Sequence, residues 1–341
     1  MKNKKLIILI IVAALAIFVS TYRLDLYITR PGGAYELSPL VEVKGGDEDD
    51  EGSLSLMTVS MLNATPSLYL FAKIKDSYKI LQPEQVRSPH ESDEEYNVRQ
   101  LKLMSDSQLN ALQVAFEQAE LPYEVTSNGV FVLNVLEGGA ADGTLQAGDQ
   151  VLSLDGNEFT AQEEFIDYIS SKKEGEAVEV VYERDEREIT SSIELAPLPG
   201  EPGRVGLGIS FVENKDIMTT PEVEIDSDSI GGPSAGLMFT LEIINQLLDE
   251  DITKGYNVAG TGTMASNGDV GRIGGIDQKI IAADNEGIEI FFAPDDEAEG
   301  IADTNYDVAI ETAEKIDSDM EIVPVETIED ALSYLEELDA K

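Results

Sequence analysis

The N-terminal segment constrains this chain more than any other feature, because residues 6–19 are uninterruptedly apolar, LIILIIVAALAIFV. The next three residues extend the span to about 17, the short end of what a bilayer-crossing helix requires. Lysines precede the run at positions 2, 4 and 5, and positive residues stay on the cytoplasmic side. We therefore predict a single-pass anchor in the cell membrane, with the rest of the chain extracytoplasmic. A cleaved signal peptide is the alternative, but no evident small-x-small cleavage site follows the run.

The composition excludes several classes of function. The chain of 341 residues carries 23 Lys and Arg against 67 Asp and Glu, a net charge of −44, so a general nucleic-acid binder is excluded. Cysteine is absent, which excludes disulfides, thiol catalysis and Cys-type zinc sites. A Ser-His-Asp site would have to use His90, the single histidine, whose place before a helical pattern is more typical of a surface or capping residue. The acidic runs at 45–52 and 295–303 indicate solvated surface rather than metal sites, and we expect no cofactor.

Residues 121–200 show an order of strand, turn and helix patterns that differs from the rest of the chain. A strand pattern, a Gly/Ala turn, the sequence AGDQVLSLDG, a helical pattern at 163–172 and two alternating strands follow one another. This order resembles a PDZ domain. The resemblance implies that an extended peptide adds as a strand to a sheet edge, with backbone amides holding its terminal carboxylate. The carboxylate loop is expected near Pro122–Val125, where the sequence PYEV lacks a glycine-rich pattern. The alternative is a small β-rich spacer.

A serine stands between glycines at the start of a helical pattern. Residues 229–239 read SIGGPSAGLMF, and an apolar helix is predicted to continue from there. A serine at a helix entrance lies near free N–H groups and the positive end of the helix dipole, which can stabilise an oxyanion formed when Ser234 attacks a carbonyl. The alternative is that Ser234 only caps the helix.

A lysine lies in a second glycine-framed helix start. Residues 260–288 contain two glycine-rich turns and then a helix predicted to begin near Asp277, with Lys279 in its first turn. Burial among the apolar residues that follow, together with the helix dipole, disfavours the ammonium form. A neutral amine near Ser234 could act as its general base. The alternative for Lys279 is a solvated surface charge.

The sequence GGPSAG, followed by the lysine of GGIDQK 45 residues after the serine, is similar to the Lon-type (S16 family) protease domain with its Ser-Lys dyad. That resemblance implies Ser234 as nucleophile and Lys279 as general base. It also places a threonine of the family, which orients the lysine amine, at Thr261. The oxyanion donors are expected among the backbone amides around Ser234, with Gly232, Pro233 and Ala235 as supporting residues. The alternative is that Thr261 is only a turn residue whose side chain hydrogen-bonds the backbone.

The resemblance extends over nearly the whole chain. An anchor, the segments TRPGGAYELSPLVEV and SLMTVS, a helical stretch with LMSDSQ at Leu103–Gln108, a PDZ-like domain and a Lon-type domain together resemble the membrane-anchored PDZ–Lon serine proteases of Gram-positive bacteria, the YlbL or SepM type. No G-x-x-x-x-G-K-[ST] motif occurs, which implies an ATP-independent enzyme. Peptides or exposed protein segments are the expected substrates.

The predicted fold is α+β, with an N-terminal transmembrane helix and a PDZ-like β-rich domain inserted before a C-terminal Lon-type proteolytic domain. The predicted divisions are a cytoplasmic tail and anchor at 1–22, a strand and helical region at 23–120, the PDZ-like domain at 121–200 and the protease domain at 201–341. Within the second division, residues 25–43 are predicted to form strands with a turn at Pro31–Gly33. The protease domain is predicted to include a strand at 205–213. The expected partners are peptide or protein substrates and the membrane, without nucleic acid or ATP.

Three questions stay open at this point. The chain could be an inactive peptide-binding adaptor or sensor rather than an enzyme, or, on charge alone, a cation-dependent acidic protein. The PDZ-like domain could recruit substrates or cover the active site until a peptide displaces it. An oligomer is possible: ATP-driven Lon domains form hexameric rings, but the anchored type lacks the ATPase module that helps build them, so a monomer or a trimer is as plausible.

Overall fold

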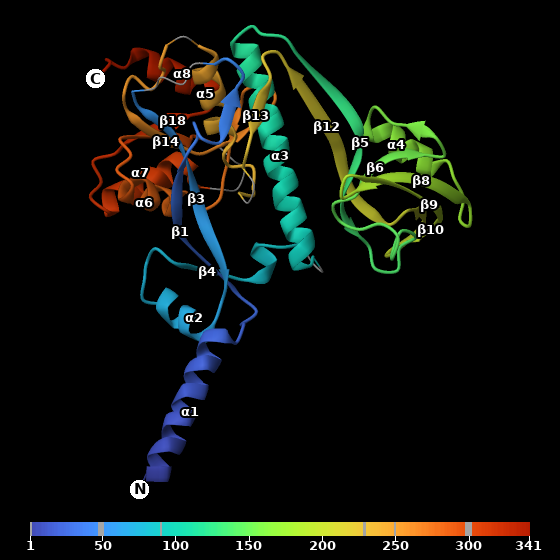
Figure 1. Ribbon diagram of the computed structural model, residues 1–341, viewed down its shortest axis with the longest axis horizontal. Helices are drawn as coiled ribbons and strands as arrows, with labels where there is room; N and C mark the ends of the chain where they lie inside the picture. Colours follow the sequence, from blue (N-terminus) through green and yellow to red (C-terminus); the bar gives the residue numbers. More distant parts are fainter. Residues whose placement is uncertain (1, 47–50, 89–90, 228–229, 249, 297–301) are drawn as a thin grey trace.

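The computed structural model describes residues 2–46, 51–88, 91–227, 230–248, 250–296 and 302–341. His90 lies outside the described residues, as do parts of both acidic runs. Figure 1 shows three parts along the molecule: a projecting N-terminal helix, a main body of helices around a sheet, and a smaller β-rich unit on two long strands. The mixed α and β character predicted from the sequence is confirmed.

The main body is built on a six-stranded sheet in the order β18–β17–β14–β3–β1–β4. Its strands are β1 (Tyr27–Glu36), β3 (Ser53–Asn63), β4 (Lys79–Leu81), β14 (Asn257–Gly260), β17 (Ile290–Pro294) and β18 (Glu321–Val325). The strands β3, β14, β17 and β18 run parallel, whereas β1 pairs antiparallel with both β3 and β4. The N-terminal strands therefore complete the sheet of the C-terminal unit. The structure does not separate them as the predicted division at 23–120 would.

The prediction of a turn at Pro31–Gly33 was wrong. Strand β1 runs through this segment, with a shift of register against β3 between Pro31 and Ala34. The hydroxyl of Thr58 accepts from the Gly33 amide and donates to the Gly33 carbonyl, both at 3.1 Å, in place of regular ladder bonds. A Cβ at Gly32 would lie 2.3 Å from Thr58 Oγ1, so glycine here permits the close approach of two strands rather than a turn.

Helices cover both faces of this sheet. On one face lie α3 (Asp93–Gln118), α5 (Gly236–Leu247) and α8 (Ile328–Glu337), and on the other α6 (Ile276–Asn285) and α7 (Asn305–Lys315). Neighbouring residues of a strand serve opposite faces: Phe292 of β17 joins the cluster of α3, α5 and α8, whereas Phe291 joins the cluster of α6 and α7. Such strands are hydrophobic on both faces, as expected for the parallel part of a sheet.

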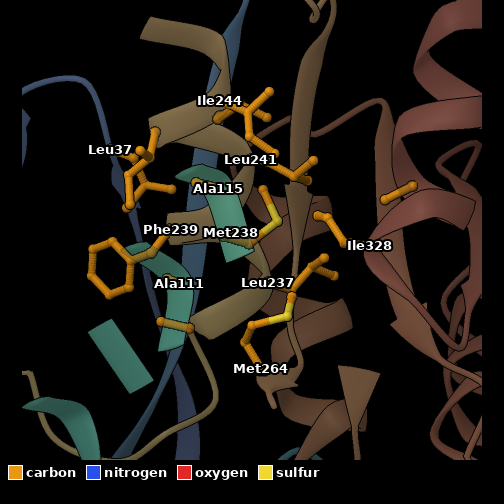
Figure 2. Close-up of a cluster of buried hydrophobic side chains, with 14 of the residues drawn as sticks. Leu37, Ala111, Ala115, Leu237, Met238, Phe239, Leu241, Ile244, Met264 and Ile328 are labelled. Atoms are coloured by element: carbon orange, nitrogen blue, oxygen red, sulfur yellow. The ribbon is translucent and has the colours of Figure 1, made fainter. Parts of the chain in front are cut away.

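Helix α5 is the centre of the larger cluster, and all its residues from Gly236 to Gln246 are buried. Figure 2 shows Leu237, Met238 and Leu241 of α5 among side chains from three other elements, with Ala111 and Ala115 of α3 on one side. The small alanines let α3 lie close to α5. This packing fixes the start of α5, where Ser234 stands.

The smaller unit has a second sheet in the order β12–β5–β6–β8–β9, with β7 paired to β6. Its elements are β5 (Tyr123–Val135), β6 (Gln150–Leu154), β7 (Asn157–Glu158), α4 (Gln162–Ser170), β8 (Ala177–Arg184), β9 (Arg187–Glu194), β10 (Ala196–Leu198), β11 (Glu201–Gly206) and β12 (Ile209–Thr219). The sequence predicted a strand at 205–213 in the protease domain. The structure instead ends β11 at Gly206 and pairs β12 with β5 over their lengths, so this unit extends past the predicted boundary at 200.

The remaining elements are short, apart from the first helix. They are α1 (Lys2–Thr21), β2 (Val41–Val43), α2 (Pro66–Ala72), the 3-10 helix η1 (Pro83–Gln85), β13 (Val223–Ile225), β15 (Thr263–Met264) and β16 (Val270–Gly271). The pairs β2–β13 and β15–β16 are two-stranded and antiparallel. Residues Lys4–Thr21 of α1 have a mean hydropathy of 2.3 and none of them is buried, so by length and composition this helix can cross a membrane or serve as a signal sequence.

Candidate active site

The serine predicted as nucleophile stands just before helix α5. Gly232 has a φ of 92°, which glycine adopts without strain, and this places the chain in a tight turn before Ser234. The N-cap of α5 is Ala235, and no side chain caps the helix. The capping alternative for Ser234 therefore does not hold. A Cβ at Gly236 would lie 2.7 Å from both Met264 and Ser107, so the turn also needs glycine on its other side.

The lysine predicted as general base is buried inside the protein. Helix α6 begins at Ile276, after Gly275 with a φ of 72°, and Lys279 is in its first turn as predicted. Lys279 is only 4% exposed, and its amine makes no ion pair with any of the described residues. Burial lowers its pKa from 10.5 to about 7, because an ammonium loses its hydration there. The surface-charge alternative is contradicted.

Three side chains from distant parts of the sequence meet in one hydrogen-bonded triangle. Lys279 Nζ lies 2.8 Å from Ser234 Oγ and 2.8 Å from Thr261 Oγ1. Thr261 Oγ1 in turn donates to the main-chain carbonyl of Ser234 at 2.9 Å. Thr261 is fully buried, just after β14, whereas Ser234 is half-buried and so reachable from outside. The structure thus brings together all three side chains that the sequence singled out.

The backbone amides near Ser234 are not all available as oxyanion donors. The Gly232 amide donates to the carbonyl of Gln100 in α3 at 2.9 Å, and Pro233 has no N–H. The amides of Ser234 and Ala235 make no hydrogen bond within the described part of the chain. Of the stretch predicted from the sequence, these two amides can therefore receive a developing negative charge, while Gly232 and Pro233 shape the turn.

Helix α3 supports the serine turn, which the sequence analysis missed. Ser107 Oγ donates to the Pro233 carbonyl at 2.9 Å, and Asn110 Nδ2 donates to the Met264 carbonyl at 2.8 Å. Both residues belong to the part of α3 that packs on α5. The sequence could have indicated this role, because Ser107 and Asn110 are polar residues within an apolar helical pattern. Polar side chains that are buried in this way usually hydrogen-bond backbone groups that lack another partner.

The smaller unit contains a groove between α4 and the segment that joins β11 to β12. The groove has a volume of about 280 Å³ and is lined by residues of α4, β10, β11 and β12 and by the segment Gly206–Gly208. Its apolar side chains are Phe165, Ile166, Ile169, Leu198, Val205, Leu207, Ile209 and Phe211. Strand β12 is the end strand of its sheet, so its outer edge can pair with an added strand. The groove has the shape and edge that peptide capture requires.

The predicted place of the carboxylate loop was wrong. Residues Tyr123–Val125 begin strand β5 and pair with Ile217–Thr219 of β12, so their backbone is committed to the sheet. The glycine-framed segment Gly206–Ile209, sequence GLGI, lies at the mouth of the groove instead, and Gly208 has a φ of 75°. Two glycines just before a strand pattern could have indicated a carboxylate loop here. The sequence interpretation missed it because it assigned this strand to the protease domain.

Two known domain families match successive parts of the chain. Residues 111–195 match the PDZ domain family, and residues 202–337 match the Lon protease (S16) C-terminal proteolytic domain. The chain is 31% identical over 147 residues to a Lon protease of Metamycoplasma arthritidis, covering 43% of this chain and 16% of that protein. It is 30% identical over 125 residues to a Lon protease of Aster yellows witches'-broom phytoplasma, covering 37% of this chain and 14% of that protein.

A solved structure is also similar to part of the chain. The PDZ domain of the SdrC-like protein from Listeria monocytogenes is 38% identical and covers 26% of this chain and 93% of that chain, with a TM-score of 0.25. The matched region spans about one sixth of the length of the two Lon proteases, at 16% and 14%.

The fold and the site define a two-unit protein, in which a β-rich unit with an apolar groove is joined to an α/β body that pairs a half-buried serine with a buried lysine. The chain matches a PDZ domain followed by a proteolytic domain of the Lon (S16) type, and this combination fits a PDZ–Lon-type protease. The narrower Gram-positive YlbL or SepM type stays a prediction from the sequence.

Proposed function

We propose that this protein is an ATP-independent serine endopeptidase, anchored in the membrane by α1, that cleaves peptides or exposed protein segments outside the cytoplasm. The observation that carries the proposal is the 2.8 Å contact between Lys279 Nζ and Ser234 Oγ. The lysine is buried without an acidic partner among the described residues, and burial lowers its pKa to about 7. Near neutral pH, a large fraction of such an amine is uncharged and can take the proton of a hydroxyl.

The hydrogen bonds of Thr261 prepare the amine for this role. A hydroxyl has one proton, and Thr261 uses its proton on the Ser234 carbonyl. Toward Lys279, Thr261 can therefore only accept, so one N–H of the amine points at Thr261 Oγ1. This orientation leaves the nitrogen lone pair free to face Ser234 Oγ. In the proposed mechanism, Thr261 is a positioning residue.

The reaction then proceeds by acyl transfer. The lysine amine takes the Ser234 proton while Oγ attacks the peptide carbonyl, and the amides of Ser234 and Ala235 stabilise the oxyanion. The ammonium of Lys279 gives its proton to the leaving amine as the C–N bond breaks, which leaves an acyl-serine. The same amine then takes a proton from a water molecule as the water oxygen attacks the ester carbonyl. As the ester C–O bond breaks, the ammonium returns this proton to Ser234 Oγ, which releases the second product and restores the neutral amine. No step requires a metal, a cofactor or ATP.

We propose that the groove of the PDZ domain captures the carboxyl-terminal segment of a substrate. The segment would pair with the outer edge of β12, and the amides of Gly206–Ile209 would hold its carboxylate. Because the groove lies in a separate unit from Ser234, it serves to recruit a substrate rather than to select the scissile bond. Loss of the groove should lower cleavage if the PDZ domain recruits substrates. It should raise cleavage if the PDZ domain covers the active site.

The proposal is tested with the full chain in lipid or detergent and an unstructured peptide as substrate. Ser234→Ala and Lys279→Met should each abolish cleavage while leaving peptide binding to the groove intact. A serine-reactive boronate should inhibit the wild type and should not bind Ser234→Ala. Unchanged cleavage by either variant would reject the dyad. Binding without any cleavage by the wild type would instead favour the peptide-binding adaptor.

A further inference from the structure

Helix α2 and the turn after it expose large apolar side chains to solvent. Leu70, Phe71 and Ile74 are 64%, 45% and 80% exposed. The opposite side of α2 is already buried, because Ala72 packs with Ile28 and Ala64 in a small hydrophobic cluster. Three large apolar side chains within five residues of one short segment mark an interaction surface rather than scattered exposure. We call Leu70–Lys75 the α2 patch.

The α2 patch lies next to the end of the apolar helix α1. Helix α2 contacts α1, and Figure 1 shows it beside the end of α1 from which the folded part emerges. At this end the rings of Phe18 and Tyr22 stack with their centroids 4.9 Å apart. Aromatic side chains at the end of a span gather at the level of the lipid headgroups. If α1 spans a bilayer, the α2 patch is held at that level.

The charge distribution singles out the same place. Residues 1–24 and 52–75 are the two longest stretches of the chain without an acidic residue, although the chain has 67 Asp and Glu and a net charge of −44. Within 52–75 the only charged residues are Lys73 and Lys75, both exposed. Anionic headgroups repel an acidic surface and attract a basic one. The α2 patch is therefore a face of the folded part that an anionic bilayer can accept.

We propose that the α2 patch is a second membrane contact, which inserts Leu70, Phe71 and Ile74 into the interfacial layer while Lys73 and Lys75 bind anionic lipid headgroups. The inference rests on the proposed membrane-spanning role of α1 and adds to it a partner for the folded part. With two points of attachment, the main body cannot turn freely about the end of α1. The orientation of the active site relative to the bilayer is thereby fixed.

The absence of tryptophan from the chain makes this contact measurable. Three single-tryptophan variants of the full chain are placed in vesicles of phosphatidylcholine and phosphatidylglycerol, with or without bromine on the acyl chains near the headgroup. Ile74→Trp reports on the patch and Phe18→Trp on the span. Met218→Trp is the matched control, because Met218 is 60% exposed near the end of β12, and Figure 1 shows β12 away from α1 and α2.

Ile74→Trp should show blue-shifted emission and lose most of it in brominated lipid, as Phe18→Trp should, whereas Met218→Trp should keep its emission. Quenching of Phe18→Trp without quenching of Ile74→Trp overturns the patch proposal and leaves the anchor standing. No quenching of either rejects the membrane span itself. A blue shift of Ile74→Trp that depends on protein concentration and not on bromine would show that a second copy of the chain covers the patch.

The role of the two lysines has a separate test. In the Ile74→Trp background, Lys73→Gln with Lys75→Gln should reduce quenching in anionic vesicles to the level seen with phosphatidylcholine alone. The control replaces Lys172 and Lys173 by Gln, two adjacent lysines in the PDZ unit, and should leave quenching unchanged. Equal quenching by anionic and neutral lipid in the parent variant would overturn the headgroup contact.

Discussion

The Thr261 hydroxyl donates its proton to the main-chain carbonyl of Ser234 at 2.9 Å, and the same oxygen lies 2.8 Å from Lys279 Nζ. One buried side chain thus ties the backbone of the proposed nucleophile to the amine of the proposed base. The Gly262 amide also donates to the Ser234 carbonyl, at 3.0 Å, so the serine turn keeps a second anchor when Thr261 changes. The effect of Thr261 on the amine can therefore be separated from its effect on the fold.

Thr261→Val should lower kcat by about a hundredfold with little change in KM, because the amine loses the acceptor that orients it. Thr261→Ser keeps the hydroxyl and should recover most of the activity. Steady-state kinetics on one peptide, with the unfolding midpoint measured in parallel, checks both. If Thr261→Ser were as impaired as Thr261→Val while both remained folded, the methyl group and not the hydroxyl would be the important part of this residue.

Activity should depend on pH through Lys279. Burial lowers the pKa of this amine from 10.5 to about 7, and only the uncharged amine can act as base. We expect kcat/KM to rise through pH 7 and to level off at alkaline pH. A profile of kcat/KM against pH with an uncharged peptide checks this, and the inflection reports the pKa in the free enzyme. An inflection near 10.5 would show that the lysine is solvated in the working enzyme.

The same burial has a consequence for stability. Below about pH 7 both the folded and the unfolded chain carry the charge of Lys279, so the cost of burying it is fully present. Between about 7 and 10.5 the unfolded chain binds more protons, and the stability of the folded state rises with pH. Lys279→Met should therefore be more stable than the wild type at pH 7, and this advantage should shrink by about 1.4 kcal/mol per pH unit toward pH 10.

Denaturant unfolding of the wild type and Lys279→Met at several pH values measures this difference. Lys315→Met is the control, since Lys315 is exposed at the end of α7 and its replacement removes a lysine without changing the buried interior. A constant difference for Lys279→Met would mean that the buried lysine keeps its charge through a partner outside the described residues.

Local patterns predicted the elements around Ser234 and Lys279 better than they predicted the architecture. Glycines that permit a tight turn, an apolar helix after Ser234 and a helix that begins close to Lys279 are all local features, and the structure has each of them. What no local pattern shows is that residues 53–56 of β3 pair with residues 257–260 of β14. Such a pairing joins segments about 200 residues apart, so the N-terminal strands could not be assigned to the protease body from the sequence.

Glycine caused two of the wrong local predictions, because it permits more than one backbone feature. At Pro31–Gly33 the sequence predicted a turn, but the structure uses Gly32 for the approach of Thr58 within a continuous strand. At Gly206–Gly208 the glycines form the mouth of the peptide groove, although the sequence predicted an uninterrupted strand there. Which feature a glycine serves depends on the element packed against it, and the sequence does not contain that information locally.

The groove of the PDZ unit can be changed without touching Ser234 or Lys279, so recruitment of a substrate can be measured separately from its cleavage. Ile166 lines the groove and is 38% exposed, so a charged side chain fits there without disturbing the core of the PDZ unit. Ile166→Glu should repel a bound carboxylate and oppose apolar side chains in the groove. For a long unstructured substrate with a free carboxyl terminus, we expect KM to rise about tenfold, a loss of about 1.4 kcal/mol, with kcat unchanged.

A short peptide that cannot reach both the groove and Ser234 should be cleaved as by the wild type. Met218→Glu, an equally charged change at an exposed position of β12 outside the groove lining, should affect neither substrate. Faster cleavage of the short peptide by Ile166→Glu would instead indicate that the PDZ domain covers the active site in the resting protein.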